Sequence, residues 1–384
     1  MKLRLTAEQD AVVGRARAFA SSRLRARVAE FDQAGVPREI VQALGREGLL
    51  GALVPADLGG SPLDAITWGL VTEEIGKVCC NTRYLLTVHA SIVAGTLARW
   101  GSRAQKAKWL PALATGDVVG AFALSEPETG SDAANVRTRY EASEGGFRIE
   151  GRKRWTTFGA MADVFLVFAR RGDEVTAFLV ERDRPNVHVK PIRDVLAGRG
   201  SHLAELHFEG VEVPKENVVG SLGAGFRYVC STALDIGRYS VAWAAVGVAQ
   251  GALEAMSTYA GKREQFGQRL HEFQLVKAMI ADAVTDVHAA RALCMHAGML
   301  RDKRDPEAMI ESSIAKQFAA RVATRVTADA LQVHGAYGLL HGGVVEMLFR
   351  EARALSIIEG STQIQQIVIG DHGAQAYGEG THET

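Results

Sequence analysis

The spacing of apolar residues changes twice along this chain, and the two changes constrain the fold more than any other feature of the sequence. Residues 1–117 and 218–384 place apolar side chains at helical intervals, whereas residues 118–217 hold short runs of β-branched and aromatic residues. Two such runs, residues 164–169 and 175–180, are separated by a Gly-Asp pair that is typical of a hairpin turn. The pattern predicts an α+β protein with an N-terminal helical domain, a middle antiparallel β-domain and a C-terminal four-helix bundle.

The composition limits the classes of partner. The 384 residues exceed what one ordinary hydrophobic core organises. The chain carries 44 basic and 44 acidic side chains with no long run of one sign, so we expect no nucleic-acid partner. Its four cysteines form no C-x-x-C motif, which predicts buried or idle thiols in a reducing compartment and no metal site. The first residues lack the apolar core of a signal peptide and no apolar run could span a bilayer, so we expect a cytoplasmic protein without a membrane partner.

Two loops in the predicted β-domain have the composition of a ligand-binding site. The first, residues 125–132, and the second, residues 155–163, each follow an apolar strand and hold hydroxyl side chains, glycine and an acid. Such loops leave backbone N–H groups for a ligand, and small side chains allow it to approach closely. Trp155 lies beside Thr156 and Thr157, so its ring could cover one face of a planar ligand. The alternative is a pair of ordinary hairpin loops, and the residue types alone leave both interpretations open.

The predicted bundle holds further polar residues, each with a structural alternative. Asp235 and Arg238 are three residues apart, which suits an ion pair within one helix. Arg263 lies in a polar break between two predicted helices. Its side chain could bind a phosphate group, or it could merely cap a helix. Glu359 follows two isoleucines in the last predicted helix, residues 344–369, where apolar surroundings would raise its pKa and suit it as a general base. A surface or capping role is the alternative for Glu359.

The N-terminal helical region offers no convincing site. Glu73 and Glu74 are most simply interpreted as a solvated helix face, and His89 as a core or surface residue rather than a ligand. No segment matches G-x-x-x-x-G-K-[ST] or a strand–G-x-G-x-x-G–helix unit, which excludes a P-loop and a Rossmann site. The tail after Gly370 is rich in glycine and polar residues, so we expect it to fray.

Several motifs, taken in their order along the chain, resemble the acyl-CoA dehydrogenase family. The resemblance extends to about residue 370 and rests on residues 122–132, 151–163, 198–201, 234–238, 263–267, 273–274, 332–338 and 350–365. It implies a tightly bound FAD, a β-domain between two helical domains, and a homotetramer or homodimer. It also implies an oxidoreductase that removes a Cα proton from an acyl thioester, carried on CoA or an acyl carrier protein, and transfers a Cβ hydride to flavin N5. The electron acceptor stays unknown.

The resemblance also implies roles for individual residues. Glu359 matches the catalytic base; some members place the base on the helix of residues 234–238, but Gly237 stands at that position here. Positions of the thioester pocket are matched by Ser131, Asp235, Arg238 and Gly360. FAD-binding positions within one subunit are matched by Phe122, Leu124, Ser125, Ser131, Trp155, Thr157, Ser361 and Gln363. Positions that reach the FAD of a neighbouring subunit are matched by Arg263, Gln265, Phe266, Gln274, Gln332, Gly335 and Ala336.

The chain departs from the family pattern at several of these positions. Phe158 stands where asparagine is usual, Ala336 replaces a glycine, and Ile358 replaces a common tyrosine beside the base. Other residues, among them 240–243, resemble the subgroup that acts on acyl-carrier-protein thioesters in polyketide extender-unit pathways of the hydroxymalonyl or methoxymalonyl type. The sequence therefore favours a carrier-protein thioester over a CoA thioester. The competing hypotheses are a flavin-binding protein without catalysis and a monooxygenase on the same fold.

Overall fold

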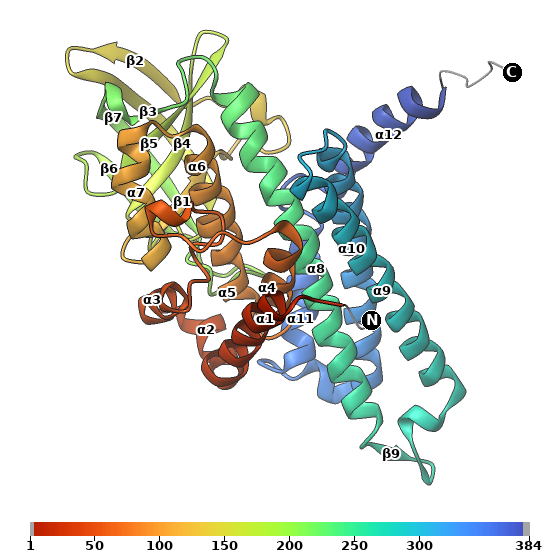
Figure 1. The fold of residues 1–384 in the computed structure, drawn as a ribbon. Helices are drawn as coiled ribbons and strands as arrows, with labels where there is room; N and C mark the ends of the chain where they lie inside the picture. The colour runs from red at the N-terminus through yellow and green to blue at the C-terminus, as the bar shows by residue number, and fades with distance from the viewer. Residues whose placement is uncertain (1–3, 379–384) are drawn as a thin grey trace, which may run out of the picture. The chain divides into compact units, whose positions relative to one another are not determined.

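The computed structural model describes residues 4–378 (Figure 1). These residues form two compact units. Unit 1 holds the residues up to Ala29, Asp64–Cys80 and the residues from Arg238 onward. Unit 2 holds Glu30–Leu63 and Asn81–Gly237. No helix within residues 4–378 is long and apolar enough to cross a membrane. The three predicted domains, 1–117, 118–217 and 218–384, stay a prediction, and their outermost residues, 1–3 and 379–384, lie outside the described part.

Unit 2 is built on one sheet with the strand order β6-β7-β3-β2-β4-β5-β8, and β1 pairs with β4. Neighbouring strands are mostly antiparallel, whereas β1 and β2 pair with β4 in parallel. Strands β3 and β7 alternate buried and exposed residues, while β4 and β5 are buried on both faces. The strands are β1 (Gly120–Ala123), β2 (Arg139–Ser143), β3 (Gly146–Thr156), β4 (Val164–Arg171), β5 (Glu174–Glu181), β6 (Val187–Pro191), β7 (Ala204–Pro214) and β8 (Val218–Val219).

Helices of unit 2 pack against strands β4 and β5 through one apolar cluster. Leu97, Leu110 and Leu113 lie in this cluster with Leu166 and Phe168. The helices are α3 (Arg38–Arg46), α5 (Cys80–Leu85), the π-helix η4 (Leu86–Ala94), α6 (Gly95–Trp100) and α7 (Arg103–Thr115), with the shorter turns η3 (Ala56–Leu58), η5 (Ala133–Asn135), η6 (Lys215–Asn217) and η7 (Gly225–Cys230).

His89 on η4 is a core residue and not a ligand. Its ring is fully buried, Nε2 donates to the carbonyl of Leu113 at 2.9 Å, and Nδ1 accepts from the N–H of Gly120 at 3.1 Å. Burial lowers the pKa of His89 to about 4, so the ring is neutral at neutral pH. The hydrogen bond to Gly120 fixes the start of β1, the strand that leads into the first of the two candidate loops.

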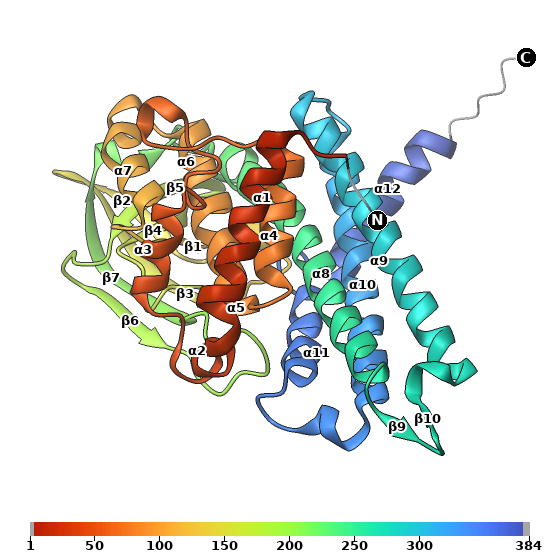
Figure 2. The ribbon, with the colours of Figure 1, turned by 60° about the horizontal axis from the view of Figure 1, so that its bottom comes forward.

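Unit 1 is a helical bundle around one core of small and branched side chains. Trp243, Val287, Ala319 and Val326 belong to that core, and Leu70 joins it from α4. Figure 2 shows the hairpin of β9 (Glu264–Gln265) and β10 (Gln268–Arg269) where α8 connects to α9. The helices are α1 (Ala7–Phe19), α2 (Val28–Ala34, continuing into unit 2), α4 (Ala65–Gly76), α8 (Ser231–Ala260), α9 (Gln274–Asp302), α10 (Ala308–His334), α11 (Val344–Leu355) and α12 (Thr362–Gly378), with the short segments η1 (Ala20–Leu24), η2 (Arg25–Arg27), η8 (Leu270–Glu272) and η9 (Gly335–Leu339).

Two expectations about the C-terminal segment are wrong. The predicted single helix over residues 344–369 is two helices, because Glu359 and Gly360 between α11 and α12 both have positive φ. The segment after Gly370 does not fray at once, since α12 continues to Gly378. The remainder of that tail, residues 379–384, lies outside the described part.

The expectation of a solvated face at Glu73 and Glu74 is also wrong. Both side chains are buried in unit 1, at 7% and 8% exposure. The guanidinium of Arg291 on α9 donates to both oxygens of Glu73, at 2.6 and 3.1 Å. Glu74 accepts from Arg17 on α1 at 3.0 Å and faces Lys77 at 2.7 Å. Paired cations make the burial of these carboxylates tolerable. Lys77 is a local partner at the end of α4, but Arg291 and Arg17 lie on other helices, where a local pattern does not reveal them.

Candidate active site

A buried ion pair in unit 2 joins the two candidate loops. Lys153 on β3 is fully buried, and its Nζ donates to Glu126 Oε1 at 2.7 Å and to the carbonyl of Leu124 at 3.0 Å. The Glu126 carboxylate also accepts from the backbone N–H groups of Arg137 at 2.5 Å and Thr138 at 2.9 Å. The Glu126 carboxylate of the first loop is therefore tied both to β3, just before the second loop, and to the segment that leads into β2.

The charges of this pair stabilise each other against the cost of burial. Burial lowers the pKa of Lys153 to about 8, although Glu126 opposes the shift. Burial acts to raise the pKa of Glu126, but Lys153 and the two backbone N–H groups outweigh it and the pKa is lowered. Carboxylate and ammonium are therefore both charged at neutral pH. Sequence reasoning missed this pair, although Lys153 falls on the inward phase of a strand that starts with Phe147 and Ile149.

The second loop presents an aromatic face and a buried hydroxyl. Trp155 has a φ of 63° and is 49% exposed, and the guanidinium of Arg154 lies 4.9 Å from its ring centre. The backbone N–H of Arg154 donates to the carbonyl of Ser125 at 2.8 Å, which joins the two loops again. Thr156 Oγ1 is buried and has no hydrogen-bond partner among residues 4–378. An exposed ring beside an unpartnered hydroxyl fits a planar ligand with polar edges.

The other candidate residues in the sheet region of unit 2 lie on β1, directly after it, or on the two candidate loops. Leu124 is buried and Phe122 lies edge-on to Phe168 with ring centres 5.4 Å apart, so both have packing roles in the sheet core. Ser125 and Thr157 are half-buried and Ser131 is exposed, on loops that the Lys153 pair holds. Phe158, which departs from the family pattern, is fully buried with a φ of 59°.

Glu359 lies in a constrained turn of unit 1. Its φ is 52° and that of Gly360 is 86°, so two successive residues are left-handed. This conformation costs a residue with a Cβ about 1–2 kcal/mol, so surrounding contacts must enforce it at Glu359. At Gly360 an added Cβ would lie 2.5 Å from Gln365 Nε2, so a larger residue would displace the end of this buried side chain. The N–H of Thr362 donates to the carbonyl of Ser356 at 3.0 Å and closes the turn.

The surroundings of Glu359 differ in part from the expected ones. Ile358 packs against the core of unit 1, but Ile357 is 57% exposed and does not desolvate the carboxylate within one chain. A buried lysine that the sequence reasoning missed, Lys316 on α10, donates to the carbonyl of Gly360 at 2.6 Å. The available signal was its position in the buried stripe of α10, between Ser312 and Ala320. Arg238 is half-buried on α8, and its positive charge also acts on Lys316.

The remaining thioester and cofactor candidates, on α8 and at the start of α12, are half-buried or exposed. Asp235 lies one turn before Arg238 on α8, is half-buried, and belongs to unit 2. Ser361 precedes α12, and its hydroxyl accepts from the N–H of Ile364 at 3.3 Å. Gln363 is exposed in the first turn of α12.

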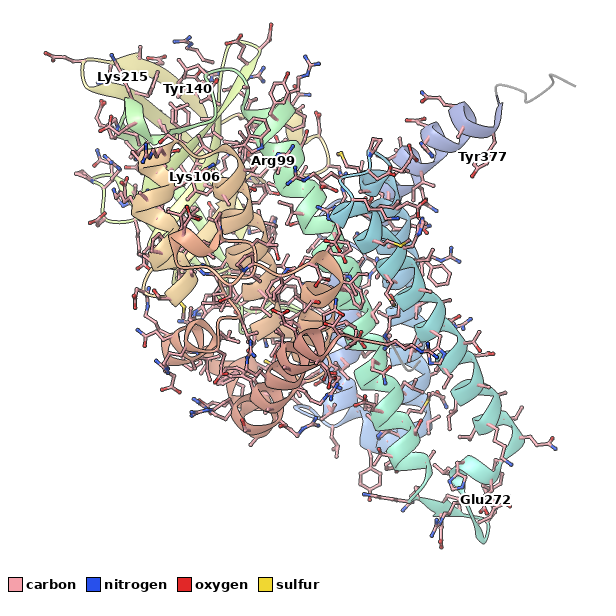
Figure 3. The ribbon with its side chains drawn as sticks, in the orientation of Figure 1. Arg99, Lys106, Tyr140, Lys215, Glu272 and Tyr377 are labelled. Atoms are coloured by element: carbon pink, nitrogen blue, oxygen red, sulfur yellow. The ribbon has the colours of Figure 1, made fainter. Side chains whose placement is uncertain are left out.

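The candidates for a second subunit's cofactor lie on exposed segments of unit 1. Arg263 and Tyr337 meet, with the guanidinium 5.9 Å from the ring centre, and Tyr259 stacks on His334 at 4.2 Å. These four residues line a cavity of about 770 Å³. Figure 3 labels Glu272, where the chain leaves the hairpin for α9. The candidate residues are all exposed: Arg263, Gln265, Phe266, Gln274, Gln332, Gly335 and Ala336.

Comparison with known proteins decides the family. Models of the acyl-CoA dehydrogenase N-terminal, middle and C-terminal domains match residues 6–117, 121–211 and 223–374. An acyl-CoA dehydrogenase of Bacillus subtilis is 36% identical over 341 residues, 88% of this chain and 89% of that protein. The chain belongs to the acyl-CoA dehydrogenase family. This confirms the predicted α+β fold and, at the level of the family, the predicted acyl-thioester dehydrogenase and its cofactor FAD.

Two solved structures show how closely the fold agrees. Butyryl-CoA dehydrogenase from Megasphaera elsdenii superposes with a TM-score of 0.93 at 32% identity, covering 97% of this chain and 99% of that one. FkbI, a protein for biosynthesis of the methoxymalonyl extender unit of the Fk520 polyketide, superposes with a TM-score of 0.87 at 32% identity, covering 94% and 99%. The roles of single residues, the thioester carrier and the oligomeric state stay predictions.

Proposed function

We propose that this acyl-CoA dehydrogenase family member oxidises the Cα–Cβ bond of an acyl thioester, with Glu359 as the base that removes the Cα proton. The observation that carries the proposal is the enforced left-handed turn, which holds a half-buried carboxylate at the junction of α11 and α12. A base must be fixed within hydrogen-bond reach of the proton that it takes. Bound FAD supplies the acceptor for the Cβ hydride.

The residues of unit 2 fit the cofactor. The exposed ring of Trp155 offers a face for a planar ring system, and the buried hydroxyl of Thr156 has a free hydrogen-bond capacity. Ser125, Ser131 and Thr157 add hydroxyl groups on loops that are held by buried charges. In unit 1, Ser361 and Gln363 at the start of α12 complete the proposed set. For the thioester we propose Ser131, Asp235, Arg238 and Gly360.

The decisive test is rapid anaerobic mixing of the purified holoenzyme with butyryl-CoA while the flavin absorbance is followed. The proposed dehydrogenase bleaches its flavin in a single turnover, because electrons leave the substrate without oxygen. Absence of bleaching with this ester and with longer or carrier-bound esters would support a flavin-binding protein without catalysis. Hydroxylated product that forms only with oxygen would indicate a monooxygenase.

A second candidate substrate is an acyl thioester on a carrier protein. The subgroup resemblance in the sequence motivates it, and FkbI, a protein for biosynthesis of a methoxymalonyl extender unit, is similar across most of both chains. The subgroup-like residues 240–243 do not carry this choice directly, because they are buried in the unit 1 core and cannot contact a carrier. We expect faster bleaching by a butyryl group on a phosphopantetheinylated carrier protein than on CoA. The comparison uses one acyl group at matched concentrations, and faster reduction by the CoA ester would reverse the assignment.

We also propose that a neighbouring subunit completes each FAD site, in a homotetramer or homodimer. The exposed Arg263, Gln265 and Phe266 support this, because Phe266 is 94% exposed in one chain and a cavity opens beside Arg263. Dilution that dissociates the oligomer should therefore release FAD, as measured by size-exclusion chromatography with detection at flavin wavelengths. A monomer that keeps a full complement of flavin would contradict the proposal.

A further inference from the structure

Lys316 is a charged side chain in the interior of unit 1. It lies on the buried side of α10, is 1% exposed, and its Nζ donates to the carbonyl oxygen of Gly360 at 2.6 Å. Neighbouring buried hydroxyls on α10 behave differently: Ser312 and Ser313 bond to carbonyls one turn back within their own helix, at 2.7 and 3.2 Å. Lys316 instead connects α10 to the turn that holds Glu359.

The turn is held from two sides. Gln365, which is fully buried on α12, donates through Nε2 to the carbonyls of both Glu359 and Gly360 at 3.3 Å. Lys316 supplies the shorter bond to Gly360 from α10. Because both carbonyls accept from buried donors, the two left-handed residues cannot rotate without leaving a buried donor unpaired. The direction in which the Glu359 side chain leaves the backbone is thereby fixed.

The charges around Lys316 come from two elements. Burial lowers the pKa of Lys316 to about 8, Glu359 opposes the shift, and Arg238 on α8 adds to it. Below about pH 8 the lysine is an ammonium, so its positive charge attracts the Glu359 carboxylate. The interaction is reciprocal: a cation that is stabilised by Glu359 favours the ionised form of Glu359.

We propose that Lys316 is a positioning residue for Glu359, which fixes the Glu359–Gly360 turn through the carbonyl of Gly360 and favours the carboxylate through its charge. The inference rests on the proposed function, in which Glu359 is the base. Lys316 itself touches no reacting atom in this scheme. Its loss should therefore affect proton removal more strongly than thioester binding, in which Gly360 is one of four proposed residues.

The test compares Lys316→Met with Ser313→Ala in the FAD-loaded enzyme. Methionine keeps the length and apolar stem of lysine but has neither charge nor N–H, whereas Ser313→Ala truncates a buried polar group on the same helix. We expect flavin reduction by saturating butyryl-CoA to slow by about tenfold to a hundredfold in Lys316→Met, as for a misplaced base. The Kd of the thioester should change less than the reduction rate, because only Gly360 of the proposed thioester residues lies in the turn that Lys316 holds.

A pH profile separates this role from general destabilisation. Loss of the cation should move the acid limb of the reduction rate upward in Lys316→Met, since the carboxylate loses an attractive positive charge. Ser313→Ala should leave the limb in place even if thermal unfolding shows a lower midpoint. Lys316→Gln keeps an N–H donor without charge, and it should show the same upward movement with a smaller loss of rate.

The outcomes are distinguishable. If wild-type protein is not reduced by any thioester, the proposed function fails and this inference fails with it. If the wild type is reduced while Lys316→Met and Lys316→Gln keep the wild-type rate and acid limb, Lys316 has no positioning role. Should the methionine variant not fold, as seen by thermal unfolding, the glutamine variant alone decides by the position of its acid limb.

Discussion

Replacing Glu359 by glutamine is expected to slow flavin reduction by at least about two orders of magnitude, the range found for loss of a positioned general base. The Cα–H bond of a thioester is a weak acid, so proton removal needs a base at a fixed place. Glutamine keeps the size of the side chain and can keep its hydrogen bonds, but it cannot take a proton. Single-turnover mixing with butyryl-CoA, with the flavin absorbance as readout, measures the effect directly.

The same experiment needs evidence that only chemistry has changed. FAD content and thioester affinity of Glu359→Gln should equal those of the wild type, because neither depends on the proton acceptor. Glu311→Gln, which removes a carboxylate from the first turn of α10, is the matched control and should reduce normally. Reduction at nearly the wild-type rate in Glu359→Gln would mean that the base lies elsewhere.

Replacing Lys153 by methionine is expected to destabilise unit 2 by about 3–5 kcal/mol, the usual cost of removing one partner of a buried ion pair. Glu126 would remain buried with two backbone N–H donors but no cation. Because this pair holds both candidate flavin loops, FAD should also bind more weakly. Thermal unfolding of the FAD-free protein and titration of FAD by its fluorescence measure the two effects separately.

Two further variants make that prediction specific. Lys215 lies on the exterior of unit 2, so Lys215→Met should change neither stability nor FAD affinity by much (Figure 3). In the double variant with Lys153→Met and Glu126→Gln no unpaired charge stays buried, so part of the lost stability should return. A Lys153→Met protein as stable as Lys215→Met would show that the pair contributes nothing to the loops.

The fold class could be predicted because it depends on the spacing of apolar residues, which can be seen in the sequence. Buried and exposed residues alternate along strand β3, and buried residues recur on one side of helix α10. Both patterns involve residues that are close together in the chain. The break at Glu359 was missed because the apolar residues on both sides keep a helical spacing, although Gly360 is a local signal for the end of a helix. The turn is also held by Lys316, which is 43 positions earlier in the chain. Contacts over such separations leave no trace in a local pattern.

In the candidate site, too, the sequence did not identify contacts between residues that are far apart in the chain. The motif around Trp155 was recognised by resemblance, but the resemblance did not say that Lys153 inside it is buried and paired. Nor did residue types indicate that Glu73 meets Arg291, 218 positions later. A charged residue at a position whose neighbours on the same face are apolar is the signal that was available in each case. It indicates a buried pair without identifying the partner.

The route of the chain through the two units sets an order for its completion during synthesis. All segments of unit 2 have been made once residue 237 is added, whereas unit 1 draws on the earliest helices and on the last third of the chain. The carboxylate of Glu73 on α4 therefore waits for a guanidinium on α9 before its burial is compensated. A truncated chain that ends at residue 237, or a fragment that begins at 238, contains one member of this pair without the other. Neither half of the gene product would carry unit 1 as an independent folding unit.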